Sequence, residues 1–207
     1  MGYSTYHGSF FDQKGVCRIH IIGGAGSGKT TLACTLGARL DLPVYHLDEI
    51  YLEQGSQVES LLDSLFADVH RIAAQSAWIT EGIYLWWTDE LLRTADAIIW
   101  LDIPWRRAAW RLIARYVRTG LKRPSSLSAL HRLRKLISYL YSEILWSERK
   151  YYLDSSIMNP GTVHDANDNN RATTAQYLAS YSGKLVRCCT YAEIESFLTG
   201  IKQEANI

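Results

Sequence analysis

The sequence lacks most of the features that would place a chain outside the ordinary globular proteins. Of its 207 residues only 4 are Cys and 4 are Pro, and the formal net charge is +1 at pH 7. No apolar run approaches the roughly 18 to 20 residues that a membrane span requires. The first fifteen residues have neither a basic segment nor an apolar core, so they do not resemble a signal peptide. We therefore expect a cytoplasmic protein that does not enter the membrane.

The few cysteines lead to the same expectation. Cys17, Cys34, Cys188 and Cys189 lack the spacing of a zinc site and fall inside stretches predicted to be apolar elements. Buried, reduced thiols explain them better than a redox site does, and reduced thiols are typical of cytoplasmic proteins.

Short β-rich runs alternate with helical patterns, which predicts an α/β fold with a parallel sheet covered by helices on both faces. The predicted strands are 16–22, 43–47, 77–80, 97–101 and 185–189. The predicted helices are 30–40, 56–74, 88–93, 105–118, 127–153 and 190–202, the last beginning with a capping box. We expect a tail at 1–15 and a single domain at 16–207, with a lid at about 105–150 and a polar loop at about 154–174.

A glycine-rich motif follows the first predicted strand. Residues 23–30 read GGAGSGKT, which satisfies the pattern G-x-x-x-x-G-K-[ST] between an apolar strand and an amphipathic helix. Glycines let backbone N–H groups turn inward, and the helix N-terminus adds partial positive charge, so such a loop can hold phosphate. The residues expected to bind nucleotide are Gly24, Ala25, Gly26, Ser27, Gly28, Lys29, Thr30 and Thr31.

The last residues of the motif carry its chemistry. Lys29 is a mobile positive charge that can follow the β- and γ-phosphates, and the Thr30 hydroxyl can ligate Mg²⁺. The motif predicts a bound nucleoside triphosphate, but it does not choose between an ATPase, a GTPase and a kinase. A GTPase is disfavoured because the sequence has no Asn-Lys-x-Asp motif for reading guanine.

Two carboxylates follow or end predicted strands on the same edge of the sheet. Asp48 could orient or deprotonate an acceptor hydroxyl, or hold a water of the magnesium shell, or simply begin a turn. Glu81, at the end of the third strand, could hydrogen-bond to the ligands of Mg²⁺, or it could simply belong to a strand-end turn. The predicted metal site is therefore Thr30, Asp48 and Glu81. Asp102 is interpreted as a helix cap rather than a metal ligand.

Positive charge is concentrated between residues 105 and 150, which carry a net +10 against −9 for the remainder of the chain. Arg111 and Arg115 are four residues apart and so share one helical face. With Arg118 and Arg123 nearby, they could close over a triphosphate as a lid does. A solvated basic face is the alternative interpretation.

Beyond the glycine motif, three segments resemble a known family: HLDEIYLEQG, AWITEGIY and AIIWLDIPWRRAAWRLIARYVRTGLKRP. They are similar to the adenylate kinase-like DNA topology modulation proteins, in the nucleoside and nucleotide kinase branch of P-loop folds. The resemblance implies a three-layer α/β/α fold, a five-stranded parallel sheet in the order 2-3-1-4-5 and a helical lid to which Arg111 and Arg115 belong. The chain departs from those relatives at residues 81–84, which read EGIY where the relatives usually have Asp-Gly-Asn-Tyr.

The acceptor is expected to be uncharged. Kinases of nucleoside monophosphates hold the acceptor phosphate with arginines that follow the second and third strands, and here only Arg71 and the more distant Arg93 are available. A dianion that met so little positive charge in a partly dry site would bind poorly.

Aromatic residues are the other feature of the acceptor region. Four aromatic residues could form a flat wall against a base, namely Tyr51, Tyr84, Trp86 and Trp87. Alternatively, they pack in the core or make a dimer contact. Helix-to-sheet packing is the expected role of Trp100, Trp105 and Trp110. We expect His20 to be a core imidazole rather than a catalyst.

The sequence thus predicts an ATP- and Mg²⁺-dependent kinase of a small hydroxyl-bearing acceptor, a nucleoside being one candidate. Lys29, Arg111 and Arg115 would balance charge, Thr30 would hold Mg²⁺ and Asp48 would address the acceptor. The alternative is an ATP-binding regulatory protein whose basic segment, interleaved with aromatic residues, contacts nucleic acid. The protein is expected to be a monomer or a homodimer.

Overall fold

The computed structural model describes residues 16–53, 58–122, 149–154 and 169–204. Its centre is a five-stranded parallel sheet in the order β2-β3-β1-β4-β5, as predicted. The strands are β1 (Arg18–Gly23), β2 (Val44–His46), β3 (Trp78–Gly82), β4 (Ala97–Leu101) and β5 (Leu185–Cys188). Together with the glycine motif between β1 and the first helix, this order defines a P-loop α/β fold.

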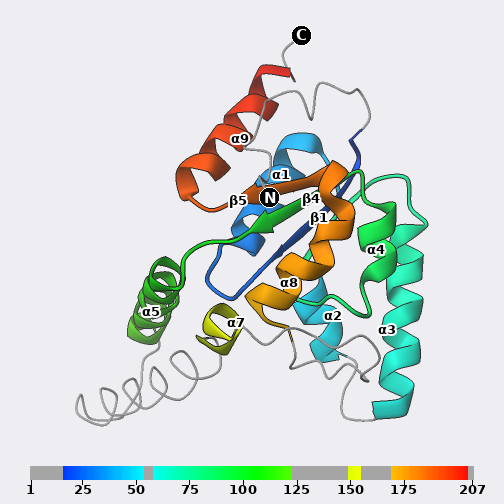
Figure 1. Cartoon of the computed structure of the whole chain (residues 1–207), viewed down its shortest axis with the longest axis horizontal. Coiled ribbons are helices and arrows are strands. Elements are labelled where there is room, and N and C mark those ends of the chain that lie inside the picture. The colour runs from blue at the N-terminus through cyan, green and yellow to red at the C-terminus, as the bar shows by residue number, and fades with distance from the viewer. Residues whose placement is uncertain (1–15, 54–57, 123–148, 155–168, 205–207) are drawn as a thin grey trace.

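Helices connect the strands and cover both faces of the sheet (Figure 1). They are α1 (Lys29–Leu40), α2 (Leu47–Glu53), α3 (Val58–Ala73), α4 (Asp89–Thr94), α5 (Trp105–Lys122), α7 (Arg149–Leu153), α8 (Arg171–Leu178), the 3-10 helix η4 (Ala179–Lys184) and α9 (Tyr191–Glu204). Among the described residues, no helix is long and apolar enough to cross a bilayer.

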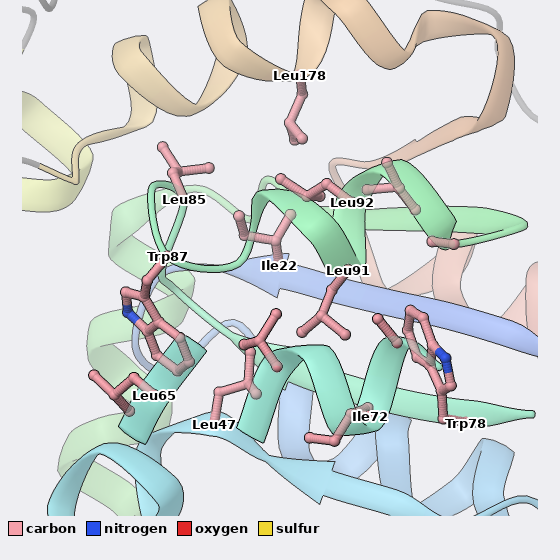
Figure 2. Close-up of a cluster of buried hydrophobic side chains, with 14 of the residues drawn as sticks. Ile22, Leu47, Leu65, Ile72, Trp78, Leu85, Trp87, Leu91, Leu92 and Leu178 are labelled. Carbon is pink, nitrogen blue, oxygen red and sulfur yellow. The ribbon is translucent and has the colours of Figure 1, made fainter. Parts of the chain in front are cut away.

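Two apolar clusters hold the layers together. On one face, α1 and α9 cover the sheet through residues such as Leu36 and Phe197, both fully buried. On the other face, α3, α4 and α8 converge on β1, β3 and β4, where Trp78, Leu92 and Leu178 belong to one buried cluster (Figure 2). The strands are near-continuous apolar runs because both of their faces are buried.

Several helix and strand boundaries differ from those predicted from the sequence. The second strand ends at His46, so Asp48 lies in the first turn of α2 rather than in a loop. The third strand extends to Gly82, so Glu81 is its next-to-last residue. The predicted break after Arg118 is wrong at its start, since α5 continues to Lys122.

The predicted polar loop at 154–174 is wrong at its end. The helix α8 begins at Arg171, because the side-chain Oδ1 of Asn170 accepts a hydrogen bond from the Thr173 N–H at 2.8 Å and caps the helix. The C-terminal capping box is confirmed, with the Glu193 N–H donating to Thr190 Oγ1 at 3.2 Å. The predicted tail at 1–15, most of the helix at 127–153 and residues 155–168 lie outside the described residues, as do Arg123 and the centre of the predicted lid.

Asp102 is not a helix cap, which corrects the prediction from sequence. Its buried carboxylate accepts hydrogen bonds from Arg171, with Nε at 2.5 Å from Oδ1, and from the guanidinium of Arg187. Arg187 also lies over the Trp100 ring, with 4.6 Å from Cζ to the ring centroid. The carboxylate therefore ties β4 to β5 and to the start of α8.

Two other expectations are also wrong. Trp110 does not bury α5 against the sheet, because it is 72% exposed. Cys34 is exposed on α1 rather than buried; all four cysteines are free thiols.

His20 is a core imidazole, as expected, and its burial predicts how stability depends on pH. Nδ1 lies 2.8 Å from Thr80 Oγ1, and desolvation lowers the pKa to about 3. Between about pH 6.5 and pH 3 the unfolded chain binds a proton that the folded chain does not, so acid favours unfolding. From pH 7.5 to pH 5, this one group should lower the free energy of unfolding by about 2 kcal/mol.

Urea unfolding of the wild type and of His20→Gln at both pH values measures this contribution. We expect the wild type to lose about 2 kcal/mol more than the variant over that interval. Equal losses in the two proteins would show that His20 does not carry the effect.

Candidate functional site

The loop between β1 and α1 turns sharply at three glycines. Gly23, Gly26 and Gly28 have φ values of 158°, 74° and 104°, of which the last two lie well inside the left-handed region that favours glycine. Ser27 N–H donates to Gly24 O at 3.2 Å, which closes the turn at the start of α1. The turn and the helix N-terminus together have the arrangement that the motif predicts for an anion site.

Two distant helices, α5 and α7, press on this loop and leave no space for side chains at Gly24 and Gly26. A Cβ atom at Gly24 would lie 2.5 Å from the Tyr151 ring, and one at Gly26 would lie 2.5 Å from the carbonyl oxygen of Ala108. The hydroxyl of Tyr152 donates to the carbonyl of Ala25 at 2.8 Å. Helices α5 and α7 therefore hold the loop in one shape.

Thr30 and Glu81 are brought together, as the predicted metal site requires. The Thr30 hydroxyl donates to Glu81 Oε1 at 3.0 Å, and the Glu81 residue is only 2% exposed. Since the Thr30 hydrogen is directed to the carboxylate, the lone pairs of its oxygen stay available for a cation. The second carboxylate oxygen, Oε2, is buried and has no hydrogen-bond partner among the described residues.

These groups fit Mg²⁺ bound mainly by nucleotide. Mg²⁺ usually keeps several waters and takes few protein ligands, with phosphate oxygens supplying others. The described residues contain no group of three or more His, Cys, Asp or Glu side chains that could hold a metal by themselves. A single hydroxyl ligand, backed by a carboxylate with one open acceptor, suits a cation that arrives with a triphosphate.

Asp48, in the first turn of α2, interacts with Lys29 and Tyr84. Desolvation is the main cause of its raised pKa, which the nearby Lys29 charge opposes and the Glu81 charge reinforces. The Tyr84 hydroxyl hydrogen-bonds to Asp48, and desolvation raises the pKa of that phenol, so it stays a donor. A carboxylate that is less acidic than usual is a better proton acceptor.

A pocket beside the loop has a volume of about 610 Å³. It brings together Lys29, Thr30, Thr31 and Asp48 with three arginines of α5 that the lid prediction named, Arg111, Arg115 and Arg118. Of the predicted nucleotide-binding residues, Ala25, Gly26 and Gly28 also line it, whereas Gly24 and Ser27 lie in the adjoining turn. Glu81 stands behind the pocket wall, in contact with Thr30.

A second pocket of about 280 Å³ adjoins the first on the α9 side. Both are lined by Gly28, Thr31 and Arg111. The Arg111 guanidinium stands over the ring of Tyr191, with 3.7 Å from Cζ to the ring centroid. This cation–π contact holds an arginine of α5 against the first residue of α9.

The aromatic wall expected for the acceptor is only partly present. Tyr84 lines the pocket and stacks with Tyr51, with ring centroids 5.3 Å apart. Trp87 is 1% exposed and belongs to the core, which is the alternative left open from sequence. Trp86 packs edge-on against Phe66 at a centroid distance of 6.2 Å.

Sequence reasoning missed four residues near the loop. His46 contacts Glu81, Tyr151 and Tyr152 contact the loop, and Tyr191 contacts Arg111. His46 could have been found, since it ends a parallel strand two residues before Asp48. The tyrosines of α7 approach the loop over more than a hundred residues of sequence, and no local pattern marks that contact.

No family model and no curated protein matches the chain. Solved structures with a similar fold include a gluconokinase from Sinorhizobium meliloti 1021, 15% identical with a TM-score of 0.45, covering 94% of this chain and 96% of that one. A shikimate kinase from Bacteroides thetaiotaomicron is 14% identical with a TM-score of 0.45, covering 92% and 99%. Another, from Acinetobacter baumannii in complex with shikimate, is 16% identical with a TM-score of 0.40, covering 86% and 99%.

The packing on the loop predicts the effect of one added methyl group. Gly26→Ala combines a left-handed backbone with a Cβ atom only 2.5 Å from the Ala108 carbonyl oxygen, so it should destabilise the protein by about 1–3 kcal/mol. Gly183→Ala is the matched control, because a Cβ atom there meets nothing within 4 Å. We expect the control to lie within about 0.5 kcal/mol of the wild type in urea unfolding. A Gly26→Ala variant as stable as the control would contradict the packing argument.

Proposed function

We propose that this protein is an ATP- and Mg²⁺-dependent kinase that phosphorylates a hydroxyl group of a small, uncharged acceptor. The observation that carries the proposal is the single pocket shared by Lys29, Thr30, Asp48, Arg111 and Arg115. It joins a triphosphate site to a carboxylate that can address a hydroxyl group. The resemblance of the sequence motifs to the DNA topology modulation proteins agrees with this proposal.

In the proposed reaction the acceptor oxygen attacks the γ-phosphorus of ATP, and the bond from that phosphorus to the β–γ bridging oxygen breaks. Asp48 accepts the hydroxyl proton, and the products are ADP and a phosphate monoester. Lys29, Arg111 and Arg115 balance the charge on the transferred group. Mg²⁺, when bound beside Thr30, would neutralise charge on the phosphates.

The second pocket supplies space for the rest of the nucleotide. It continues from the loop at Gly28 and Thr31 and is bounded by the flat ring of Tyr191. A triphosphate on the loop would place its nucleoside on this side or towards Asp48, and only one side can take the acceptor. We assign the Tyr191 side to the nucleoside because Asp48 suits a hydroxyl acceptor.

The charges around Asp48 favour an uncharged acceptor. Arg71 bonds to Asp68 at 2.7 Å on α3, and Arg93 lies 3.6 Å from Asp89 on α4. Neither lines the pocket. Among the described lining residues, the cations come from α1 and α5, whereas the acceptor side offers Asp48, Ile83 and Tyr84. A phosphorylated acceptor would meet a carboxylate there without a dedicated positive partner.

The proposal extends to the setting of the protein. Its four cysteines are free, which suits the cytoplasm, where ATP is also available. The described arginines of the basic segment that line the pocket have a role in phosphate binding, so the charge does not require nucleic acid. We propose a monomer or a homodimer.

An acceptor panel tests the proposal. ADP formation from ATP and Mg²⁺ should rise when one of a set of polyols, sugars, hydroxy acids or nucleosides is added. Lys29→Ala should abolish that rise, and Asp48→Asn should lower kcat by roughly 10²- to 10⁴-fold while nucleotide still binds.

Calorimetry with ATP provides the binding control for this panel. Nucleotide binding without stimulation by any acceptor would contradict the kinase proposal, and a preference for nucleoside monophosphates would contradict the uncharged acceptor. Full activity in Lys29→Ala would place the reaction elsewhere.

A further inference from the structure

His46 is the last residue of β2 and stands directly beside Glu81 in the sheet. The two residues are register partners in the parallel pairing of β2 with β3. His46 Nδ1 lies 2.8 Å from Glu81 Oε1, and the histidine side chain is 24% exposed against 3% for the glutamate side chain. The imidazole therefore covers the carboxylate on its β2 side.

Among the described residues, the two hydrogen bonds to the Glu81 carboxylate go to the same oxygen. Oε1 takes the Thr30 hydroxyl at 3.0 Å and His46 Nδ1 at 2.8 Å. A carboxylate only accepts, so the imidazole must carry its hydrogen on Nδ1. The other oxygen, Oε2, is left buried without a partner among the described residues.

A buried carboxylate held by Thr30 alone could rotate about its last side-chain bond, because one hydrogen bond does not fix both oxygens. The second bond, from a different strand, removes that freedom. It reserves Oε1 for Thr30 and leaves Oε2 as the acceptor for a further donor, such as a water of a hydrated cation. The His46 Nδ1–H group therefore determines that Oε1 accepts from Thr30 and that Oε2 is open to another donor.

We propose that His46 is a positioning residue for the magnesium–nucleotide complex. It acts through Glu81 and makes no contact with substrate: the Nδ1–H group holds the carboxylate so that Thr30 keeps its oxygen lone pairs for Mg²⁺ and Oε2 accepts from the hydration shell. This role rests on the proposed function, since it requires that Mg²⁺ arrive with a nucleotide at Thr30.

Three substitutions at His46 test whether a hydrogen-bond donor to Glu81 is enough or whether it must lie at the position of Nδ1. In His46→Asn the amide nitrogen is the same number of bonds from Cβ as Nδ1, so it can still donate to Glu81. In His46→Gln the amide nitrogen is one bond further along, near the place of Nε2. His46→Leu removes the donor. Tyr45→Phe is the matched control on the same strand, where the lost hydroxyl donates to Gln75 Oε1 at 2.9 Å.

The measurement is the affinity for ADP by calorimetry, with Mg²⁺ and with EDTA. We expect wild type, Tyr45→Phe and His46→Asn to gain similarly from Mg²⁺. In His46→Gln and His46→Leu the gain should fall by roughly 10-fold or more, while the affinity in EDTA stays within about twofold. A purely structural role would change both affinities together, or the thermal stability alone.

Each contrary result has a separate meaning. A full Mg²⁺ gain in His46→Gln and His46→Leu would overturn the positioning role, as would a loss in His46→Asn equal to that in His46→Leu. If His46→Leu does not fold, the comparison of His46→Asn with His46→Gln decides. A wild type that binds ADP with no gain from Mg²⁺ would overturn this inference alone, whereas a wild type that binds no nucleotide would overturn the proposed function.

Discussion

The close packing around the glycine turn after β1 is the constraint on which the rest of the site depends. The turn can aim its amides at phosphate only if its backbone is held in the left-handed conformations of Gly26 and Gly28. The carbonyl of Ala108 and the rings of Tyr151 and Tyr152 occupy the space that side chains would take. Segments more than a hundred residues apart must therefore be in place together, so the anion site is a product of the whole fold.

The parallel sheet supplies the second requirement, which is convergence. Because every strand runs the same way, the carboxyl ends of β1, β2 and β3 meet at one edge. Thr30, Glu81 and His46 are far apart in sequence and form one hydrogen-bonded row across that edge. The row places an acidic group behind the proposed phosphate site without exposing it, and Asp48, two residues after His46, lines the pocket.

The sequence predicts the parts of this site that are local, and it fails where long-range contacts decide. The strand order follows from the motif resemblance, and the loop with Lys29 and Thr30 is readable because its glycines, lysine and threonine are contiguous. The start of α8 is missed because it depends on one capping hydrogen bond, from the Thr173 N–H to the side chain of Asn170, within a polar stretch that has no helical period. Asp102 is misread because its two arginine partners lie 69 and 85 residues away. Trp110 is misplaced because the helical period identifies an apolar face but not what covers it.

The partner of Arg111 is consistent with the proposed phosphate binding. Arg111 stands over the neutral ring of Tyr191, with 3.7 Å from Cζ to the ring centroid. A neutral ring is a weaker partner for a cation than a carboxylate, whereas a phosphate forms charge-assisted hydrogen bonds of about twice the ordinary strength. Asp102 shows the opposite case, since its tight pairing with Arg171 and Arg187 commits those arginines to the fold. The carboxylate of Asp102 thus fixes structural arginines, whereas a neutral ring holds Arg111 beside the pocket, where the proposed triphosphate could compete for it.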